Sequence, residues 1–135
     1  MKVVMIIDKD LPVGLIANTA AVLGASLGKM VDDLVGGDLA DADGNLHLGI
    51  TTRNIPILGA TQEQLKAIRA RLYEAEFADV TTVDFNNIAQ RSLDYGDYGR
   101  LLAETGGGAL AYLGVCLFGP QKKVNRLTGS IGLLR

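Results

Sequence analysis

The sequence predicts an α/β protein whose helices and strands form layers around a mostly parallel or mixed sheet. Two observations carry this prediction. Short apolar runs alternate along the chain with longer segments of helical periodicity, which is typical of layered α/β domains. The 135 residues match the size of one ordinary domain, and no repeat, linker or low-complexity tract divides them. Residues 1–135 are therefore expected to form a single domain.

The N-terminal region predicts a buried strand and a helix that packs on it. Val3–Ile7 is a continuous run of apolar, mostly β-branched residues, which is typical of a strand covered on both faces. Leu11–Leu27 is apolar but interrupted by polar residues, so a buried helix of a soluble protein is expected rather than a membrane span. Asp10 is placed to cap this helix. Gly24 and Gly28 indicate tight packing against the sheet or a subunit partner.

The rest of the chain continues the alternation of strands and helices. Asp43-Gly44 lies between apolar residues in an irregular stretch and is a typical hairpin turn. Thr61 and Gln64 have the spacing of a capping box, at the head of an amphipathic helix predicted to extend to about Phe77. The other predicted elements are strand Ile55–Leu58, strand Val80–Phe85, a helix over 86–104, strand Ala109–Phe118, helix Gln121–Leu127 and edge strand Ile131–Arg135.

Charge and composition limit the partners of the chain. The formal net charge is −2 and the isoelectric point about 5.3, whereas nucleic-acid-binding proteins are usually basic, so DNA is not expected and tRNA is not favoured. The first apolar run ends at Asp8, too early for a signal peptide, so a cytoplasmic protein without a membrane partner is expected. A single histidine, His47, and a single cysteine, Cys116, do not make a usual zinc site, and no metal or cofactor is expected. Cys116 lies in the apolar run Ala109–Phe118 and is expected to be a small core residue.

Two turns have the order of strand, turn and helix at which open α/β sheets bind ligands. They are Asp8–Gly14 and Phe118–Lys123, and the second brings two lysines to the start of a helix. The alternative is that both are ordinary surface connections with solvated lysines. The candidate ligand-binding residues are Gly14, Asn18, Asn86, Gly119, Lys122 and Lys123.

A few other side chains are candidates for chemistry. Asp84, near the end of the third long strand, is placed to act as a base or to position a water, although Asx residues at such places also cap helices. His47 lies in the hairpin segment, where a structural role and a proton switch are the alternatives. Tyr95 and Tyr98 are paired at helical spacing and are expected in the core or at an interface.

Six segments of the chain also follow one another in a familiar order and spacing. They are Lys2–Ile7, Asp10-Leu11 with Gly14, Leu113-Gly114-Val115, Phe118-Gly119-Pro120, Val124 to Thr128-Gly129, and Leu133-Leu134. In this order they resemble the type 2 peptidyl-tRNA hydrolases, and the chain looks most like uncharacterised bacterial proteins assigned to that fold. The resemblance implies a three-layer α/β/α sandwich with a mixed four-stranded central sheet.

The first helix departs from the hydrolase pattern. Type 2 hydrolases carry lysines in the turn that opens this helix, and a glutamine and usually a histidine farther along it. None of the matching side chains here can hold a charge or move a proton, so the resemblance supports the fold more than the activity. Matched by register, these positions are Leu15, Ala17, Ala21 and Gly24.

Three hypotheses for the function follow. The first is a small-ligand or partner-binding module without the usual catalytic residues. The second is a peptidyl-tRNA hydrolase or related ester hydrolase with a relocated site, in which Asp84, Asp10 or His47 acts near Lys122 and Lys123. The third is a structural role as a subunit of a homodimer.

Overall fold

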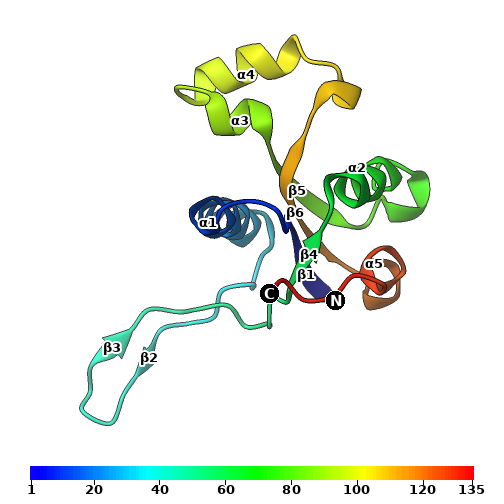
Figure 1. Cartoon of the computed structure of the whole chain (residues 1–135). Helices are drawn as coiled ribbons and strands as arrows, with labels where there is room; N and C mark the ends of the chain where they lie inside the picture. Colours follow the sequence, from blue (N-terminus) through cyan, green and yellow to red (C-terminus); the bar gives the residue numbers. More distant parts are fainter.

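The computed structural model describes residues 1–135 and contains the mixed four-stranded sheet that the sequence predicts (Figure 1). The strand order is β4 (Ile57–Ala60), β1 (Lys2–Asp8), β6 (Tyr112–Gly119) and β5 (Thr81–Asn86). β1 pairs in parallel with β4, whereas β6 runs antiparallel to both β1 and β5. Three of the four strands therefore point in the same direction, and only β6 runs against them.

Helices cover both faces of this sheet (Figure 1). The long helix α1 (Val13–Met30) packs on one face, against β1, β5 and β6. Helices α2 (Gln62–Arg71) and α5 (Gln121–Thr128) pack on the other face, against β1 and β6. The sheet thus lies between two sets of helices, which bury its two central strands, β1 and β6, on both faces.

The alternation of side chains along β1 divides the hydrophobic core into two clusters. Val4 and Ile6 belong to the larger cluster, together with the buried residues of α2 and α5. Val3, Met5 and Ile7 belong to the other cluster, beneath α1. All five side chains are at most 3% exposed, which explains why the sequence of this strand is apolar without alternation.

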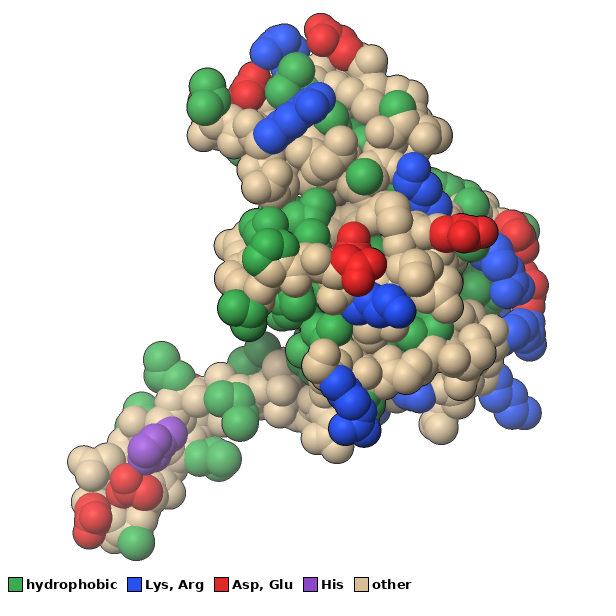
Figure 2. Space-filling model, in the orientation of Figure 1, with side chains coloured by type: hydrophobic (Ala, Val, Ile, Leu, Met, Phe, Trp, Pro, Cys, Tyr) green, Lys and Arg blue, Asp and Glu red, His purple; other side chains and the backbone are tan.

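A two-stranded arm leaves the body after α1 (Figure 1). β2 (Leu39–Ala40) pairs antiparallel with β3 (Leu46–His47), and the predicted turn is present, with Gly44 at a φ of 80°. The side chains of the arm are exposed, and Figure 2 shows that many of them are hydrophobic. The large apolar ones are Val35, Leu39, Leu46, Leu48 and Ile50.

The helix predicted over 86–104 is divided into two. α3 (Asn87–Arg91) begins where the side chain of Asn86 accepts a hydrogen bond from the backbone of Ala89. α4 (Tyr95–Ala103) begins with a new cap, Asp94, whose carboxylate accepts from the amide of Asp97 at 2.7 Å. The first helix ends at Arg91, and Asp94, whose backbone is extended, starts the second one.

Several predicted helix boundaries are corrected by the structure. Asp10 does not cap α1, because Pro12 holds the capping position and the amide of Asp10 donates instead to the carboxylate of Asp8. The capping box of Thr61 and Gln64 is confirmed, with both of its hydrogen bonds present. However, α2 ends at Arg71, and a separate 3-10 turn over Ala75–Phe77 follows.

The predicted edge strand Ile131–Arg135 is reduced to a single antiparallel bridge between Leu58 and Leu133. The tight packing expected around Gly24 is also absent, since no atom outside its own helix lies within 4 Å of a Cβ built there.

Helix α1 has the length and mean hydropathy, 18 residues and 1.3, of a helix that can cross a membrane. One such helix near an N-terminus is weak evidence for a membrane span, because core helices of soluble proteins have the same composition. Leu23 and Leu27 of this helix are fully buried against the sheet. The chain is described best as a soluble globular domain with one apolar helix.

The contact between α1 and β6 depends on a missing side chain at Gly114. A Cβ at this position would lie 2.8 Å from Cγ2 of Thr19 and 3.0 Å from the carbonyl oxygen of Ile6. We expect Gly114→Ala to lower the free energy of unfolding by about 1–3 kcal/mol, because neither the helix nor the neighbouring strand can move away freely. Gly24→Ala is the matched control and should raise the free energy of unfolding by up to about 1 kcal/mol. Urea denaturation measures both, and an unchanged stability of Gly114→Ala would contradict the close contact.

Candidate functional site

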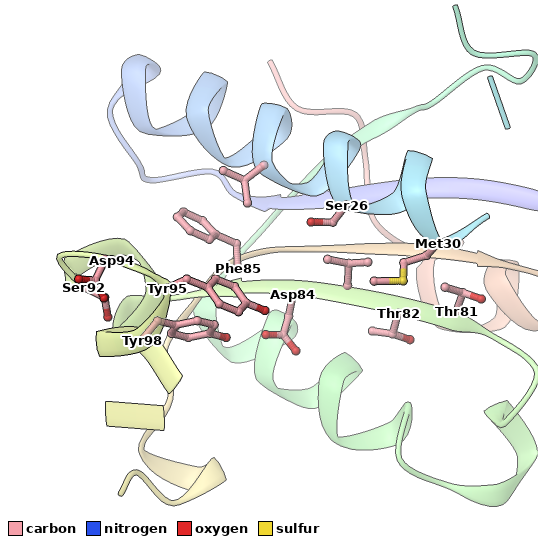
Figure 3. A pocket seen from close by; sticks show the side chains of 13 residues that line it. Ser26, Met30, Thr81, Thr82, Asp84, Phe85, Ser92, Asp94, Tyr95 and Tyr98 are labelled. Atoms are coloured by element: carbon pink, nitrogen blue, oxygen red, sulfur yellow. The ribbon is translucent and has the colours of Figure 1, made fainter. Parts of the chain in front are cut away.

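The largest cavity is a groove along the free edge of β5, with a volume of about 550 Å³ (Figure 3). The second half of α1 forms one wall, and α3 and α4 close one end. β5 is an edge strand whose outer side pairs with no other strand, so the groove runs beside unpaired backbone. The lining residues are Val22, Ser26, Met30, Thr81–Phe85, Ala89, Ser92, Asp94, Tyr95 and Tyr98.

A network of polar side chains lies at the inner end of this groove. Asp84 accepts a hydrogen bond from Nε of Arg69 at 2.8 Å, and the two side chains are only 20% and 14% exposed. Its second oxygen accepts from the amide of Asn86 at 3.3 Å. Asn86 is buried, and its amide nitrogen also lies 3.5 Å from the hydroxyl of Tyr98. Both oxygens of Asp84 are therefore occupied by neighbours that hold it in place.

Two tyrosines from α4 form the end wall of the groove (Figure 3). The rings of Tyr95 and Tyr98 meet edge to face, with their centroids 5.9 Å apart. Tyr98 is half-buried and packs against the core, whereas Tyr95 is 86% exposed. Aromatic faces beside apolar side chains make a surface suited to a flat or apolar group.

A second set of bonds ties three elements together beside Asp84. The side chain of Gln62 donates to the carbonyl oxygen of Tyr112 and accepts from its amide, both at 2.7 Å. The side-chain nitrogen of Gln62 also lies 3.3 Å from a carboxylate oxygen of Asp8. Burial, together with the negative charge of Asp84, raises the pKa of the Tyr112 hydroxyl. The first turn of α2 is therefore fastened to the ends of β1 and β6.

The two predicted ligand-binding turns lie at opposite ends of the strands. The carboxyl ends of β1, β4 and β5 lie at one end of the sheet, together with Asp10, Asp84 and Asn86. β6 runs the other way and pairs Gly119 with Lys2, so its carboxyl end lies at the opposite end of the sheet. The hydrolase hypothesis required Asp84 or Asp10 near Lys122 and Lys123, and the structure separates these residues because β6 runs antiparallel to β1 and β5.

The residues of the second turn have structural contacts of their own. A Cβ at Gly119 would lie 2.9 Å from a methyl group of Val80, so the glycine permits close packing there. Lys123 forms an ion pair with Asp79 at 2.8 Å, and Lys122 is exposed. These contacts connect α5 to the loop before β5 and do not form a pocket with Asp84.

The other predicted residues are dispersed. Gly14 and Asn18 lie on the exposed face of the first turns of α1. His47 lies on the arm, where its Nε2 is 2.8 Å from the carboxylate of Asp41 and its side chain is 65% exposed. This hydrogen bond is the main cause of a lowered pKa of Asp41. The structure brings Asp84 and Asn86 together but does not bring Asp10 or His47 into contact with them.

No group of three or more His, Cys, Asp or Glu side chains in this chain is arranged to hold a metal ion. The thiol of Cys116 is fully buried beneath α1, and burial raises its pKa to about 12. A protonated and inaccessible thiol neither attacks a substrate nor binds a metal, so Cys116 acts as a small core residue, as the sequence predicts.

Three residues of the polar network beside the groove are not predicted by the sequence, namely Arg69, Gln62 and Tyr112. Arg69 and Gln62 belong to an amphipathic helix, where polar residues normally face solvent. Tyr112 lies in an apolar run and is typical of a core strand. The one available signal was the spacing of Arg69 and Tyr73 at i and i+4, which allows the guanidinium to stack on the ring, 4.1 Å from its centroid.

The fold and the groove define a class of small α/β domain with a ligand-sized groove along an open sheet edge. The model of a family described as a protein of unknown function, DUF2000, matches residues 1–135, so the chain belongs to this family. The solved structure of a protein of unknown function from Agrobacterium tumefaciens strain C58 is similar, with a TM-score of 0.87 over 98% of this chain and 96% of that one. Its sequence identity is 20%, so the likeness concerns the fold alone. A comparison with curated proteins gave no match.

The ion pair of Arg69 and Asp84 should matter more for stability than the exposed pairs. We expect Arg69→Met to lower the free energy of unfolding by about 2 kcal/mol, because it leaves a half-buried carboxylate without its cation. Arg100→Met, which removes an exposed pair with Asp97, should cost less than about 0.5 kcal/mol. Chemical denaturation measures both. The double variant Arg69→Met with Asp84→Leu should recover part of the lost stability. Equal losses for Arg69→Met and Arg100→Met would contradict a larger role of the half-buried ion pair.

Proposed function

We propose that this protein is a binding module that holds a small, mostly apolar ligand in the groove beside β5. The observation that carries the proposal is a cavity of about 550 Å³ lined by apolar side chains and a few polar ones, of which Asp84 and Tyr98 are held by hydrogen bonds. Binding sites for small molecules commonly combine apolar walls with a few fixed polar groups. Unpaired backbone of β5 adds donors and acceptors along the floor of the groove.

A relocated hydrolase site has less support. Both oxygens of Asp84 have structural partners, Arg69 and Asn86, and no histidine or second carboxylate lines the groove beside it within hydrogen-bonding distance. His47 lies on the arm, away from the groove. The first helix presents aliphatic residues and glycine where a type 2 hydrolase carries lysine, glutamine and histidine. Binding without turnover is therefore the function that these residues support best.

We also propose that the fold is the three-layer α/β/α sandwich of the type 2 peptidyl-tRNA hydrolases, in a single domain. Helices on both faces of a mixed four-stranded sheet support this relation. A shared fold does not carry the activity with it, because activity depends on the side chains at the site.

Groove binding can be tested with indole as a neutral aromatic probe, followed by amide chemical shifts. We expect indole to shift the amides of β5 and α4 and to leave those of α5 unchanged, since α5 lies on the other face of the sheet. Ser26→Trp fills the groove and should weaken binding at least about tenfold. Ser130→Trp, beyond the end of α5, is the matched control and should bind as the wild type does. Shifts scattered over the whole surface would argue against a groove site.

The arm supports a homodimer. Its five large apolar side chains are 49–80% exposed, and no other part of the chain covers them. A two-stranded hairpin is marginally stable by itself, so this surface is expected to be covered by a partner.

A second copy of this chain fits that surface better than a membrane or a nucleic acid. Residues 36–52 contain three aspartates and no lysine or arginine, so anionic lipid and phosphate are repelled. Helix α1 also exposes an apolar side chain at each of its ends, since Val13 is 83% and Met30 63% exposed. In a twofold pair each arm can cover the α1 of the other copy, and the two contacts together can approach the roughly 800 Å² per partner of a standard interface.

Light scattering should therefore give twice the chain mass of 14.3 kDa. The double variant Leu48→Ser with Ile50→Ser should be a monomer, because it removes the most exposed apolar side chains of the arm. Leu93→Ser removes an even more exposed leucine outside the arm and should leave the dimer intact. A wild-type protein that stays monomeric at high concentration would end this proposal without affecting the groove.

A further inference from the structure

A smaller pocket lies on the other face of the sheet, between α2 and the glycine-rich segment before β6. Figure 1 shows this segment beside α2, on the side of the sheet opposite α1. The cavity has a volume of about 300 Å³, the size of a small polar group rather than of a large ligand. We call it the glycine pocket, and its lining residues are Lys66, Arg69, Ala70, Tyr73, Gly107, Gly108 and Tyr112.

Arg69 is held in this pocket with part of its guanidinium unused. Its Nε donates to Asp84 at 2.8 Å, and its Cζ lies 4.1 Å from the ring centroid of Tyr73. These two contacts fix the plane of the guanidinium, although the side chain is only 14% exposed. Its two terminal nitrogens donate to no acceptor in the protein. A guanidinium fixed through Nε presents these nitrogens as a fork that matches two oxygens of one anion.

Two further donors face the same space. Tyr112 is 6% exposed, and its hydroxyl has no hydrogen-bond partner, yet it is not sealed from solvent as the hydroxyl of Thr19 is. Lys66 forms no ion pair with any residue of the chain. No carboxylate lines the pocket, since Asp84 reaches Arg69 from the side of the groove. The pocket is therefore lined by two cationic side chains and two tyrosines, Tyr73 and Tyr112, and by no carboxylate.

The glycines beside these donors are not required by the backbone. Gly44 is the one glycine with a positive φ, and a Cβ at Gly107 or Gly108 would meet no atom within 4 Å. Larger residues would therefore be accommodated without strain, but side chains at 107 and 108 would fill the opening of the pocket. The absence of side chains at 107 and 108 therefore keeps the pocket open.

We propose that the glycine pocket binds a small oxyanion, a carboxylate or a phosphate group, between the terminal nitrogens of Arg69, the ammonium of Lys66 and the hydroxyl of Tyr112. Charged donors that already lie in place lose little entropy when the anion arrives. The site is separate from the groove and does not depend on ligand binding there. The pair of Asp84 and Arg69 forms the wall between the two cavities.

The test is a titration with inorganic phosphate and, in parallel, with acetate, at constant ionic strength set with chloride. Amide chemical shifts of α2 and of residues 106–112 report binding. We expect saturable shifts there, and about a tenfold weaker affinity for Tyr112→Phe and for Lys66→Gln, each of which removes one donor to the anion. Gly108→Val should abolish binding by occupying the pocket, while amide spectra of the free protein confirm its fold.

Lys122→Gln is the matched control, because it removes the same charge from an exposed position on α5. It should bind both anions as the wild type does. Tighter binding of phosphate would identify a phosphate site and tighter binding of acetate a carboxylate site, and either result supports the proposal. Absence of saturable shifts with both anions would overturn it, as would equal losses for Lys66→Gln and Lys122→Gln. Neither result would bear on indole binding in the groove.

Discussion

The burial of β1 on both faces is the constraint on which the rest of the structure depends. A strand with apolar side chains on both faces has to be covered from both sides, so helices must pack above and below the sheet. β1 also holds the two central pairings, parallel to β4 and antiparallel to β6. The pairing with β6 then places β5 at the edge, and the groove exists because no element pairs with that edge.

The ion pair of Asp84 and Arg69 connects the edge strand to α2 and separates the two cavities. Asp84 faces the groove with its neighbours Asn86 and Tyr98, and Arg69 faces the glycine pocket with Tyr73. A half-buried pair of this kind fixes geometry more than it adds stability, because desolvation offsets much of the attraction. Its structural role also explains why a carboxylate at the end of a strand need not be catalytic.

The arm has a different physical character from the body. Its carboxylates brace the hairpin from within, since Asp38 accepts from the amide of Gly49 and Asp41 from the amide of Asn45. Its apolar side chains, in contrast, have no partner in the chain. The arm is thus organised by local hydrogen bonds, and only another molecule can cover its apolar surface.

The sequence by itself determined the α/β class, the order of the elements, the buried Cys116, the hairpin turn at Gly44 and the capping box of Thr61. Each of these depends on residues close together in the chain, whose spacing alone carries the signal. The tertiary structure decided the direction of β6, and with it which turns share an end of the sheet. It also decided that Arg69 meets Asp84, because side-chain periodicity shows which face of an element is buried but not which element lies against it.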